Sequence, residues 1–298
     1  LLSPLVSAFA VLFLYFIIVQ FVNHWRGKVE STTDALIAFG AGTVGALTFA
    51  FTDSHWFNAV EAEVYAFSTF FTAIVVWLAL LWSEKADEKG NERYILIISY
   101  MIGLATGLHL LNLLTIPFVA LLIYFRKFKF EWTSFGILVA LTGIVFFIIH
   151  NVIIKGMPKI ADAIGVPLTG FLIITIFAGM VWAVLNQKQL ISIVLTSMVL
   201  VLIGYSTYAL IFIRSNQDPG IDENDPETVE AFISYLEREQ YGDVGMFPRR
   251  FKGIEPMHEV VGYPEGPGRQ FSASQESDYR SHQSNKQWKF FWDYQIRK

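Results

Sequence analysis

The sequence predicts an all-α, polytopic membrane protein in which transmembrane helices form a bundle. Three features of the 298 residues point to this class: 54% are hydrophobic, 16% are aromatic, and only 16% are charged. A soluble globular domain carries about a quarter charged residues. The first two thirds of the chain are therefore predicted to lie in a membrane.

A bilayer requires runs of about 17 to 25 apolar residues, and such runs recur along the first 213 residues. The stretch at residues 94–125 is too long for one span, and Gly107, Asn112 and Pro117 interrupt its helix. We expect it to form two short spans with a turn at residues 109–117. Because each of these is shorter than a full span, we expect roughly seven crossings in all. The other runs cover residues 5–21, 35–51, 64–82, 134–149, 169–185 and 190–213.

The basic residues fall in alternate loops between the predicted spans. The positive-inside rule assigns such loops to the cytoplasm, whereas the other loops carry only Lys155 and Lys159. The 52–65 loop, the turn at His109 and everything after residue 213 are therefore expected to face the periplasm or lumen. The protein is predicted to lie in the cytoplasmic (inner) membrane. The cytoplasmic loops carry Arg26, Lys28, Lys85, Lys89, Arg93, Arg126, Lys127, Lys129 and Lys188.

Two regions are expected, a transmembrane domain over residues 1–213 and a polar, extracytoplasmic segment over residues 214–298. The polar segment is predicted to be mostly irregular, with residues 247–287 as a loop, and to contain one amphipathic helix over residues 225–240. Asp225 is the expected N-cap and Pro226 the first helical residue. This helix should cover the outer ends of the membrane helices, above the 52–65 loop and His109. Its apolar stripe consists of Val229, Phe232, Ile233 and Leu236.

The two ends of the chain suggest a piece of a longer protein. The sequence begins with Leu1 rather than Met, and it shows neither a signal peptide nor a cytoplasmic leader. Because the first span is predicted to run inward, we expect a further helix and an outer loop to precede it. Residues 288–298 read as an element that has been cut short, so the polar segment is expected to be incomplete.

Several functional classes are disfavoured by what the sequence lacks. A net charge of −4 without a basic face argues against nucleic acid as a partner. No cysteine is present, which rules out disulfides and thiolate metal sites. His258-Glu259 lacks the second His of a helical zinc motif, and neither a P-loop nor a nucleophile elbow occurs. No metal site is predicted, no tightly bound cofactor is expected, and a divalent-metal requirement is left open. Gly40, Gly42 and Gly45 are expected to let neighbouring helices approach closely.

The loop between the second and third apolar runs is the main candidate for a functional site. Ionisable groups at a membrane boundary lose hydration unless they have a partner or a water-filled cavity, so they commonly mark a site. The alternative is an ordinary interfacial loop, with Trp56, Phe57 and Tyr65 as aromatic belt residues. The ionisable side chains are those of Asp53, His55, Glu61 and Glu63.

These residues also carry a resemblance to a known family. The matching motifs follow one another along essentially the whole chain and resemble an uncharacterised-domain family of multispanning proteins. That family is abundant in Bacteroidota and is similar to the animal transmembrane protein O-mannosyltransferases. The motif residues are Trp56, Ala59, Glu63, Val64 and Tyr65, then Gly107, His109, Leu113 and Pro117, then Asn224-Asp225-Pro226, then Tyr235-Leu236 and Arg238-Glu239-Gln240-Tyr241-Gly242-Asp243.

The resemblance implies a GT-C glycosyltransferase with a GT-C-like fold. Such an enzyme takes a sugar, here expected to be mannose, from a polyprenyl-phosphate carrier and transfers it to a Ser or Thr hydroxyl outside the cytoplasm. In such families the catalytic base usually comes from an acidic pair in the first outer loop. That loop would lie before Leu1, so no base is carried over, and this chain alone is expected to be inactive.

Glu63 is the favoured catalytic candidate because it lies in the family-like motif, and Asp53 and His55 are secondary candidates. Sugar transfer needs a carboxylate to deprotonate the acceptor and polar or cationic groups to hold the leaving phosphate. Arg238 is the phosphate-binding candidate, with a surface ion pair as the alternative. For His109 the alternative is a satisfied packing residue. The predicted substrate-binding residues are Glu61, Trp56, Tyr65, His109, Asn112 and Arg238.

The expected partners are membrane lipid, the lipid-linked sugar donor and a protein acceptor. Two other functions remain open. The chain could be a non-catalytic scaffold subunit of a larger cell-envelope complex, or a transporter in which His109 and the acidic loop line a path. Transporters usually show internal repeats, and the two halves of this sequence show no convincing repeat.

Overall fold

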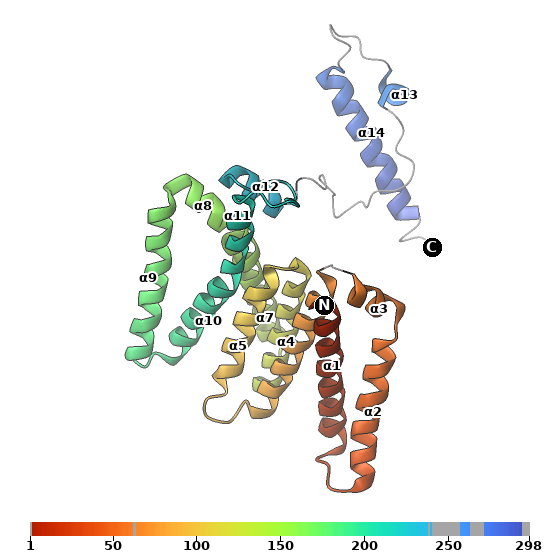
Figure 1. The fold of residues 1–298 in the computed structure, drawn as a ribbon, viewed down its shortest axis with the longest axis vertical. Helices are drawn as coiled ribbons and strands as arrows, with labels where there is room; N and C mark the ends of the chain where they lie inside the picture. The colour runs from red at the N-terminus through yellow and green to blue at the C-terminus, as the bar shows by residue number, and fades with distance from the viewer. Residues whose placement is uncertain (1, 62–63, 238, 240–256, 263–270, 294–298) are drawn as a thin grey trace. The chain divides into compact units, whose positions relative to one another are not determined.

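The computed structural model describes residues 2–61, 64–237, 239, 257–262 and 271–293 (Figure 1). The chain divides into two compact units, Leu1–Leu236 and Glu237–Lys298. Glu63 and Arg238 lie outside the described residues. Each unit is described by itself, and every regular element assigned within the described ranges is helical.

The first unit is a bundle of long helices joined by short ones. Within the described residues, seven helices are long and apolar enough to cross a membrane, which confirms the predicted all-α, polytopic bundle. The long helices are α1 (Leu2–Arg26), α2 (Thr32–Ala50), α4 (Tyr65–Lys85), α5 (Glu92–Thr106), α6 (Thr115–Lys127), α7 (Trp132–Phe147), α9 (Val166–Leu185) and α10 (Gln189–Tyr205). The short ones are α3 (Asp53–Val60), η1 (Leu110–Leu114), the π-helix η2 (Ile148–Ile154), α8 (Gly156–Ile164), η3 (Ser206–Tyr208), α11 (Ala209–Ser215) and α12 (Val229–Glu237).

The stretch at residues 94–125 turns where its sequence predicted. Helix α5 ends at Thr106, the 3₁₀-helix η1 follows, and α6 begins at Thr115. Pro117 lies in the first turn of α6, where its missing amide costs no intrahelical hydrogen bond. Helix α5 has only 15 residues, a length of about 22 Å, and is shorter than the seven candidate spans. It nevertheless runs the full way between the two ends of the bundle (Figure 1).

Successive long helices alternate in direction, so the bundle has two distinct ends (Figure 1). One end carries α3, η1, α8, α11 and α12, and we call it the α3 end. The other carries the basic loops, and we call it the basic end. There Asp87 accepts hydrogen bonds from Lys127, at 2.9 Å, and from Arg126, which hold the pKa of the Asp87 carboxyl below its ordinary value. Arg126 also donates to the Ser83 carbonyl. These bonds tie the loop after α4 to the end of α6.

The core of the bundle lies between α4, α5, η1, α6, η2 and α10. Helices α5 and α10 cross at a close approach of their backbones. A Cβ added at Gly103 would lie 2.5 Å from the Val201 carbonyl oxygen, and one added at Gly204 would lie 2.5 Å from the Leu104 nitrogen. Backbones can approach this closely only where side chains are absent, which is how small residues drive helix packing in membranes.

The glycines of α2 behave partly as predicted. A Cβ on Gly42 would lie 2.7 Å from Val19, and one on Gly45 would lie 2.6 Å from Ile18. These two glycines therefore let α1 and α2 approach closely. Gly40 differs, because nothing lies within 4 Å of its Cβ position.

Helix α12 begins later than the sequence predicted. Its N-cap interaction is made by Thr228, whose Oγ1 accepts from the Ala231 amide at 3.1 Å. Asp225 has a positive φ of 45°, a left-handed conformation that does not start a right-handed helix. The apolar stripe of α12 packs on α11 through a Phe212–Phe232 contact at 5.8 Å. Figure 1 shows α12 beside α11 and apart from α3, so the expected cover over the 52–65 loop is not found among the described residues.

The second unit contains more helix than the sequence predicted. Residues 247–287 were expected to be a loop, yet they contain all of α13 (Met257–Val261) and most of α14 (Ala273–Phe291). Helix α14 begins with a capping box, in which the Gln275 amide donates to the Ser272 side chain and the Ser272 amide donates to the Gln275 side chain. Its least exposed positions include Gln275, Tyr279 and Gln283. Because that face is largely polar, no apolar periodicity revealed the helix.

Candidate functional site

Helix α3 caps one end of the bundle. Some of its side chains are exposed to solvent, whereas others are partly or fully buried against the bundle. Asp53 is exposed in the first turn, where its charge suits the positive end of the helix dipole. Glu61 is exposed at the other end of the helix. Trp56 is 57% exposed and stacks on Phe51 at 6.2 Å, as expected of an interfacial aromatic residue. His55 is the one residue of α3 that is fully buried.

His55 is buried between α3 and the two preceding helices. It is 6% exposed, and its ring lies 4.4 Å from that of Phe49. Burial lowers the pKa of His55, and a hydrogen bond to the backbone of Ser7 opposes that effect. The structure thus places the imidazole where it fastens α3 to α1. It is not brought beside Asp53 or Glu61, and its catalytic role stays a prediction.

The η1 turn brings together residues that are distant in sequence. Asn112, only 2% exposed, accepts a hydrogen bond from Thr72 Oγ1 at 3.0 Å through its Oδ1. Its Nδ2 donates to the His109 carbonyl at 3.0 Å, and Thr115 donates to its backbone carbonyl at 2.7 Å. The Tyr65 ring lies 5.6 Å from the His109 ring. Three predicted site residues, Tyr65, His109 and Asn112, therefore meet at one place.

Thr72 and Thr115 are the members of this network that sequence reasoning missed, and Thr72 is the more distant of the two from Asn112 in the sequence. Thr72 lies within a long apolar helix, where a hydroxyl usually bonds to its own backbone and attracts no notice. A signal was nevertheless available. Thr72 follows Tyr65 by seven residues, so the two occupy the same face of α4, two turns apart.

A groove of about 700 Å³ lies beside this network. Its walls come from α1, the end of α2, α4, η1 and α6, and they are predominantly apolar. Thr72 and Thr115, which both bond to Asn112, line one side. Phe49, which packs on His55, lines another. The groove therefore touches both parts of the predicted site at the α3 end.

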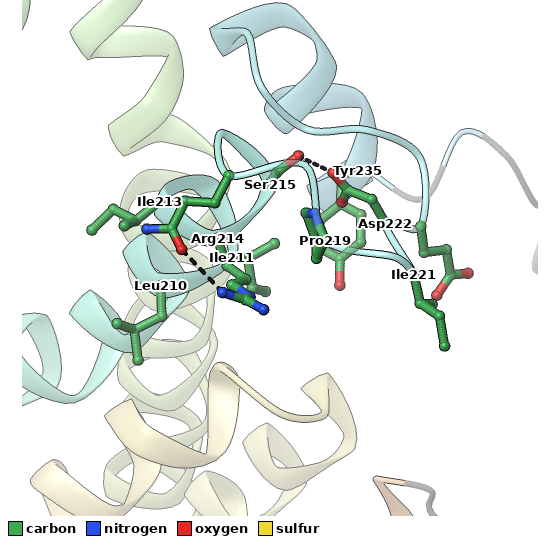
Figure 2. Close-up of a pocket in the computed structure, with 11 residues that line it drawn as sticks. Leu210, Ile211, Ile213, Arg214, Ser215, Pro219, Ile221, Asp222 and Tyr235 are labelled. Atoms are coloured by element: carbon green, nitrogen blue, oxygen red, sulfur yellow. Dashed lines mark hydrogen bonds between the residues drawn. The ribbon is translucent and has the colours of Figure 1, made fainter.

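A second pocket, of about 600 Å³, lies at the end of α11 (Figure 2). Arg214 points into it and donates to Gln217 at 3.0 Å, while Ser215 donates to Asp222 at 2.7 Å. The last apolar run was predicted to end at residue 213, one residue before Arg214, so Arg214 was not considered as a site residue. Basic residues at a span terminus commonly extend toward the interface, and that pattern could have identified it. Among residues 2–61 and 64–237, the Lys and Arg side chains at the α3 end are Lys155, Lys159 and Arg214.

The loop beside this pocket is strongly acidic. Asp222, Asp225 and Glu227 each place a carboxylate oxygen within 4.8 Å of the others. Repulsion from Asp225 is the main reason that the pKa of Glu227 is raised. Oxygen ligands of this kind suit hard cations such as Ca²⁺ or Mg²⁺. Exposed acidic groups are also common without an ion, so this cluster does not by itself indicate a metal requirement.

The η1 turn and the α11 pocket are neighbours along the α3 end. A Cβ added at Gly107 would lie 2.6 Å from Thr207 Oγ1, so the turn that leads to His109 abuts η3. Arg214 follows Thr207 by seven residues, or about 10 Å of helix. The α5–α10 crossing therefore holds the η1 network near the charged pocket.

Comparison with known proteins covers one of these two sites. No curated protein and no solved structure matches the chain. A family model matches residues 1–132, which span α1 to the first residue of α7 and so include α3, η1 and every residue lining the groove. The α11 pocket lies beyond the match. The predicted similarity to protein O-mannosyltransferases is thus confirmed for residues 1–132, which match the model of the protein O-mannosyl-transferase TMEM260 N-terminal domain.

Proposed function

We propose that this chain is the membrane part of a glycosyltransferase that moves a sugar, mannose, from a polyprenyl-phosphate carrier to Ser or Thr hydroxyls of proteins. The observation that carries the proposal is the match of residues 1–132 to a protein O-mannosyl-transferase domain. The matched residues build both the η1 network and the adjoining groove, so the similarity covers a plausible place for chemistry.

The groove supports a lipid-linked donor. Its walls run along α1 and α4 and are mostly apolar, while the hydroxyls of Thr72 and Thr115 line one side, an arrangement that suits a long apolar tail with a polar head. A lipid tail gains little hydrophobic free energy on leaving the bilayer, because lipid is as apolar as the groove. The groove would therefore position the donor, and polar groups at the α3 end would supply most of the selectivity for its head.

The reaction would break the bond between the sugar anomeric carbon and the phosphate oxygen and form a bond to the acceptor oxygen. A base must take the hydroxyl proton, and hydrogen-bond donors or cations must stabilise the departing phosphate. Asp53 and Glu61 carry exposed carboxylates on the segment that follows Phe49, a residue of the groove wall. Both remain candidates for substrate binding or proton transfer. Glu63, outside the described residues, remains the favoured base within this chain.

The proposed orientation places the α3 end outside the cytoplasm and the basic end inside. The paired basic residues at one end of the bundle support it, since Arg126 and Lys127 follow the positive-inside rule. The proposed location is the inner membrane, with the C-terminal segment in the periplasm.

The test is transfer by the full-length protein in lipid vesicles. The vesicles would receive polyprenyl-phosphate [³H]mannose and candidate acceptor proteins. We expect label to become protein-bound and to be released by alkaline β-elimination, which cleaves Ser- and Thr-linked sugars. Vesicles without the protein and donor lacking the polyprenyl chain are the controls. Absence of transfer over a broad set of acceptors, with donor binding intact, would favour the scaffold function instead.

A further inference from the structure

The α4 wall of the groove changes from polar to apolar along its length. Ser68, Thr69 and Thr72 line the groove near the α3 end, whereas Ala73 and Val76 line it further into the bundle. Val76 follows Ser68 by eight residues, or about 12 Å of helix. A molecule with a polar head and an apolar tail would therefore fit this wall with its head toward the α3 end.

Most of the hydroxyl groups in the groove wall already donate their hydrogen within the protein. Thr69 donates to the backbone carbonyl of the preceding turn at 2.9 Å, and Thr115 donates to the Asn112 carbonyl at 2.7 Å. Thr72 donates to Asn112 Oδ1 at 3.0 Å, since Nδ2 of the same amide donates elsewhere. A hydroxyl carries one hydrogen, so donation to a ligand would cost each of these threonines its present bond.

The Ser68 hydroxyl differs from these three. In the part of the chain that the structure describes it forms no hydrogen bond, and Ser68 is a partly exposed residue of the groove wall. A serine within a membrane helix commonly donates to a carbonyl of the preceding turn, as Thr69 does. A hydroxyl without a partner in apolar surroundings is costly. Ser68 therefore has a hydrogen that it can donate to a molecule in the groove without breaking a bond.

A phosphate in this groove would depend on such a neutral donor. The described residues of the groove wall include no Lys, Arg or His, and a phosphate offers only acceptor oxygens. Hydrogen bonds to an ionised acceptor are about twice as strong as those between neutral groups, and apolar surroundings strengthen them further. One hydroxyl at the polar end of the wall can therefore contribute substantially to phosphate binding.

We propose that Ser68 binds the phosphate of the lipid-linked donor by donating its hydroxyl hydrogen to a phosphate oxygen, with the lipid tail extending past Ala73 toward Val76. The inference rests on the proposed function and deepens it, because it assigns the contact that distinguishes a polyprenyl phosphate from a neutral polyprenol. Ser68 forms and breaks no covalent bond, so its role lies in binding and the transfer step belongs to other groups.

The test compares a substitution at the head of the lipid with one at its tail, in the full-length protein. Ser68→Ala removes the donor and leaves the wall almost unchanged in shape, whereas Ala73→Phe fills the space of the tail. Thr175→Val is the matched control, because it removes a hydroxyl that donates to its own helix at 2.8 Å on the exposed face of α9. The measurements are the melting temperature, the KM and kcat for polyprenyl-phosphate mannose, and the affinities for polyprenyl phosphate and polyprenol.

We expect Ser68→Ala to melt like the wild type and to bind polyprenyl phosphate about tenfold more weakly, as for the loss of a hydrogen bond to a charged group. Its KM should rise by a similar factor at nearly unchanged kcat, since the lost bond is present before and during transfer. Polyprenol should bind Ser68→Ala and the wild type equally. Ala73→Phe should weaken both lipids alike, because they share the tail, and Thr175→Val should match the wild type throughout.

Unchanged binding of polyprenyl phosphate to Ser68→Ala would overturn the proposal. Equal weakening of both lipids in that variant would show that Ser68 only shapes the wall, and a fall in kcat at unchanged KM would place it in the transfer step. Displacement of polyprenyl phosphate by an equal concentration of inorganic phosphate would overturn the lipid assignment. If the wild type prefers polyprenyl phosphate to polyprenol yet transfers no sugar, the proposed function fails, whereas the binding data still decide the role of Ser68.

Discussion

The η1 turn and the acidic loop after α11 lie at the same end of the bundle but use polar residues in different ways. At η1 the central polar group is a neutral amide, that of Asn112, which is buried with hydrogen bonds to Thr72, His109 and Thr115. In the loop, carboxylates crowd together and raise the pKa of Glu227. An anionic ligand suits the first region and would be repelled by the second. Under the proposed function, we therefore expect the sugar phosphate to bind nearer to η1 than to the acidic loop.

The η1 turn and the acidic loop should face the same side of the membrane. Cysteine labelling tests this topology, and each site should be either labelled or not labelled. Because the chain has no native Cys, single cysteines can report each location. Glu61→Cys near η1 and Glu223→Cys in the acidic loop should react with an impermeant thiol reagent in intact cells. Glu88→Cys at the basic end should react only after permeabilisation. Labelling of Glu88→Cys in intact cells, or of only one of the other two, would refute the arrangement.

Removing the centre of the neutral network should have the next largest effect. Asn112→Leu keeps the approximate size but leaves the Thr72 hydroxyl and part of the His109 carbonyl without their partner. We expect a loss of about 2 kcal/mol in stability and a fall of about a hundredfold in transfer, because the turn would shift. Glu223→Gln is the matched control in the other region and should change neither quantity. Normal activity of Asn112→Leu would remove η1 from the site.

Filling the groove should weaken donor binding without unfolding the protein. Ala73 lines the groove on α4, and Ala73→Phe would occupy space that the lipid tail needs. We expect the KM for polyprenyl-phosphate mannose to rise about tenfold, with little change in the melting temperature. Ala41→Phe makes the same substitution on an exposed face of α2 and should leave KM unchanged. Equal effects of the two substitutions would mean that the groove does not hold the donor.

The smallest effect is expected in the acidic loop. A raised pKa means that ionised Glu227 opposes folding at neutral pH and stops doing so once it is protonated. Stability should therefore increase as the pH falls through the raised pKa toward the ordinary value of 4.5. Asp225→Asn removes the main repulsion and should flatten this part of the melting-temperature profile. An unchanged profile would show that the three carboxylates do not interact in solution.

Much of the bundle could be predicted because apolar length and interrupting residues are local properties of the sequence. The turn between Thr106 and Thr115 followed from Gly107, Asn112 and Pro117. The network at Asn112 could be anticipated only in part, since the role of Thr72 depends on a contact across forty residues. Helix α14 was missed because its partly covered face is polar, and the start of α12 was misplaced because the positive φ of Asp225 cannot be inferred from residue type.

The glycine contact between α5 and α10 also constrains how this protein can change. Gly103 and Gly204 bring two backbones together with no side chain between them, so the separation of η1 from α11 cannot be adjusted by small substitutions. By contrast, α1 meets α4 through aromatic side chains such as Phe13 and Trp77, which can be exchanged for smaller or larger ones. A related protein that accepts a bulkier carrier would therefore be expected to differ along α1 and α4, and to keep α5 and α10 as they are.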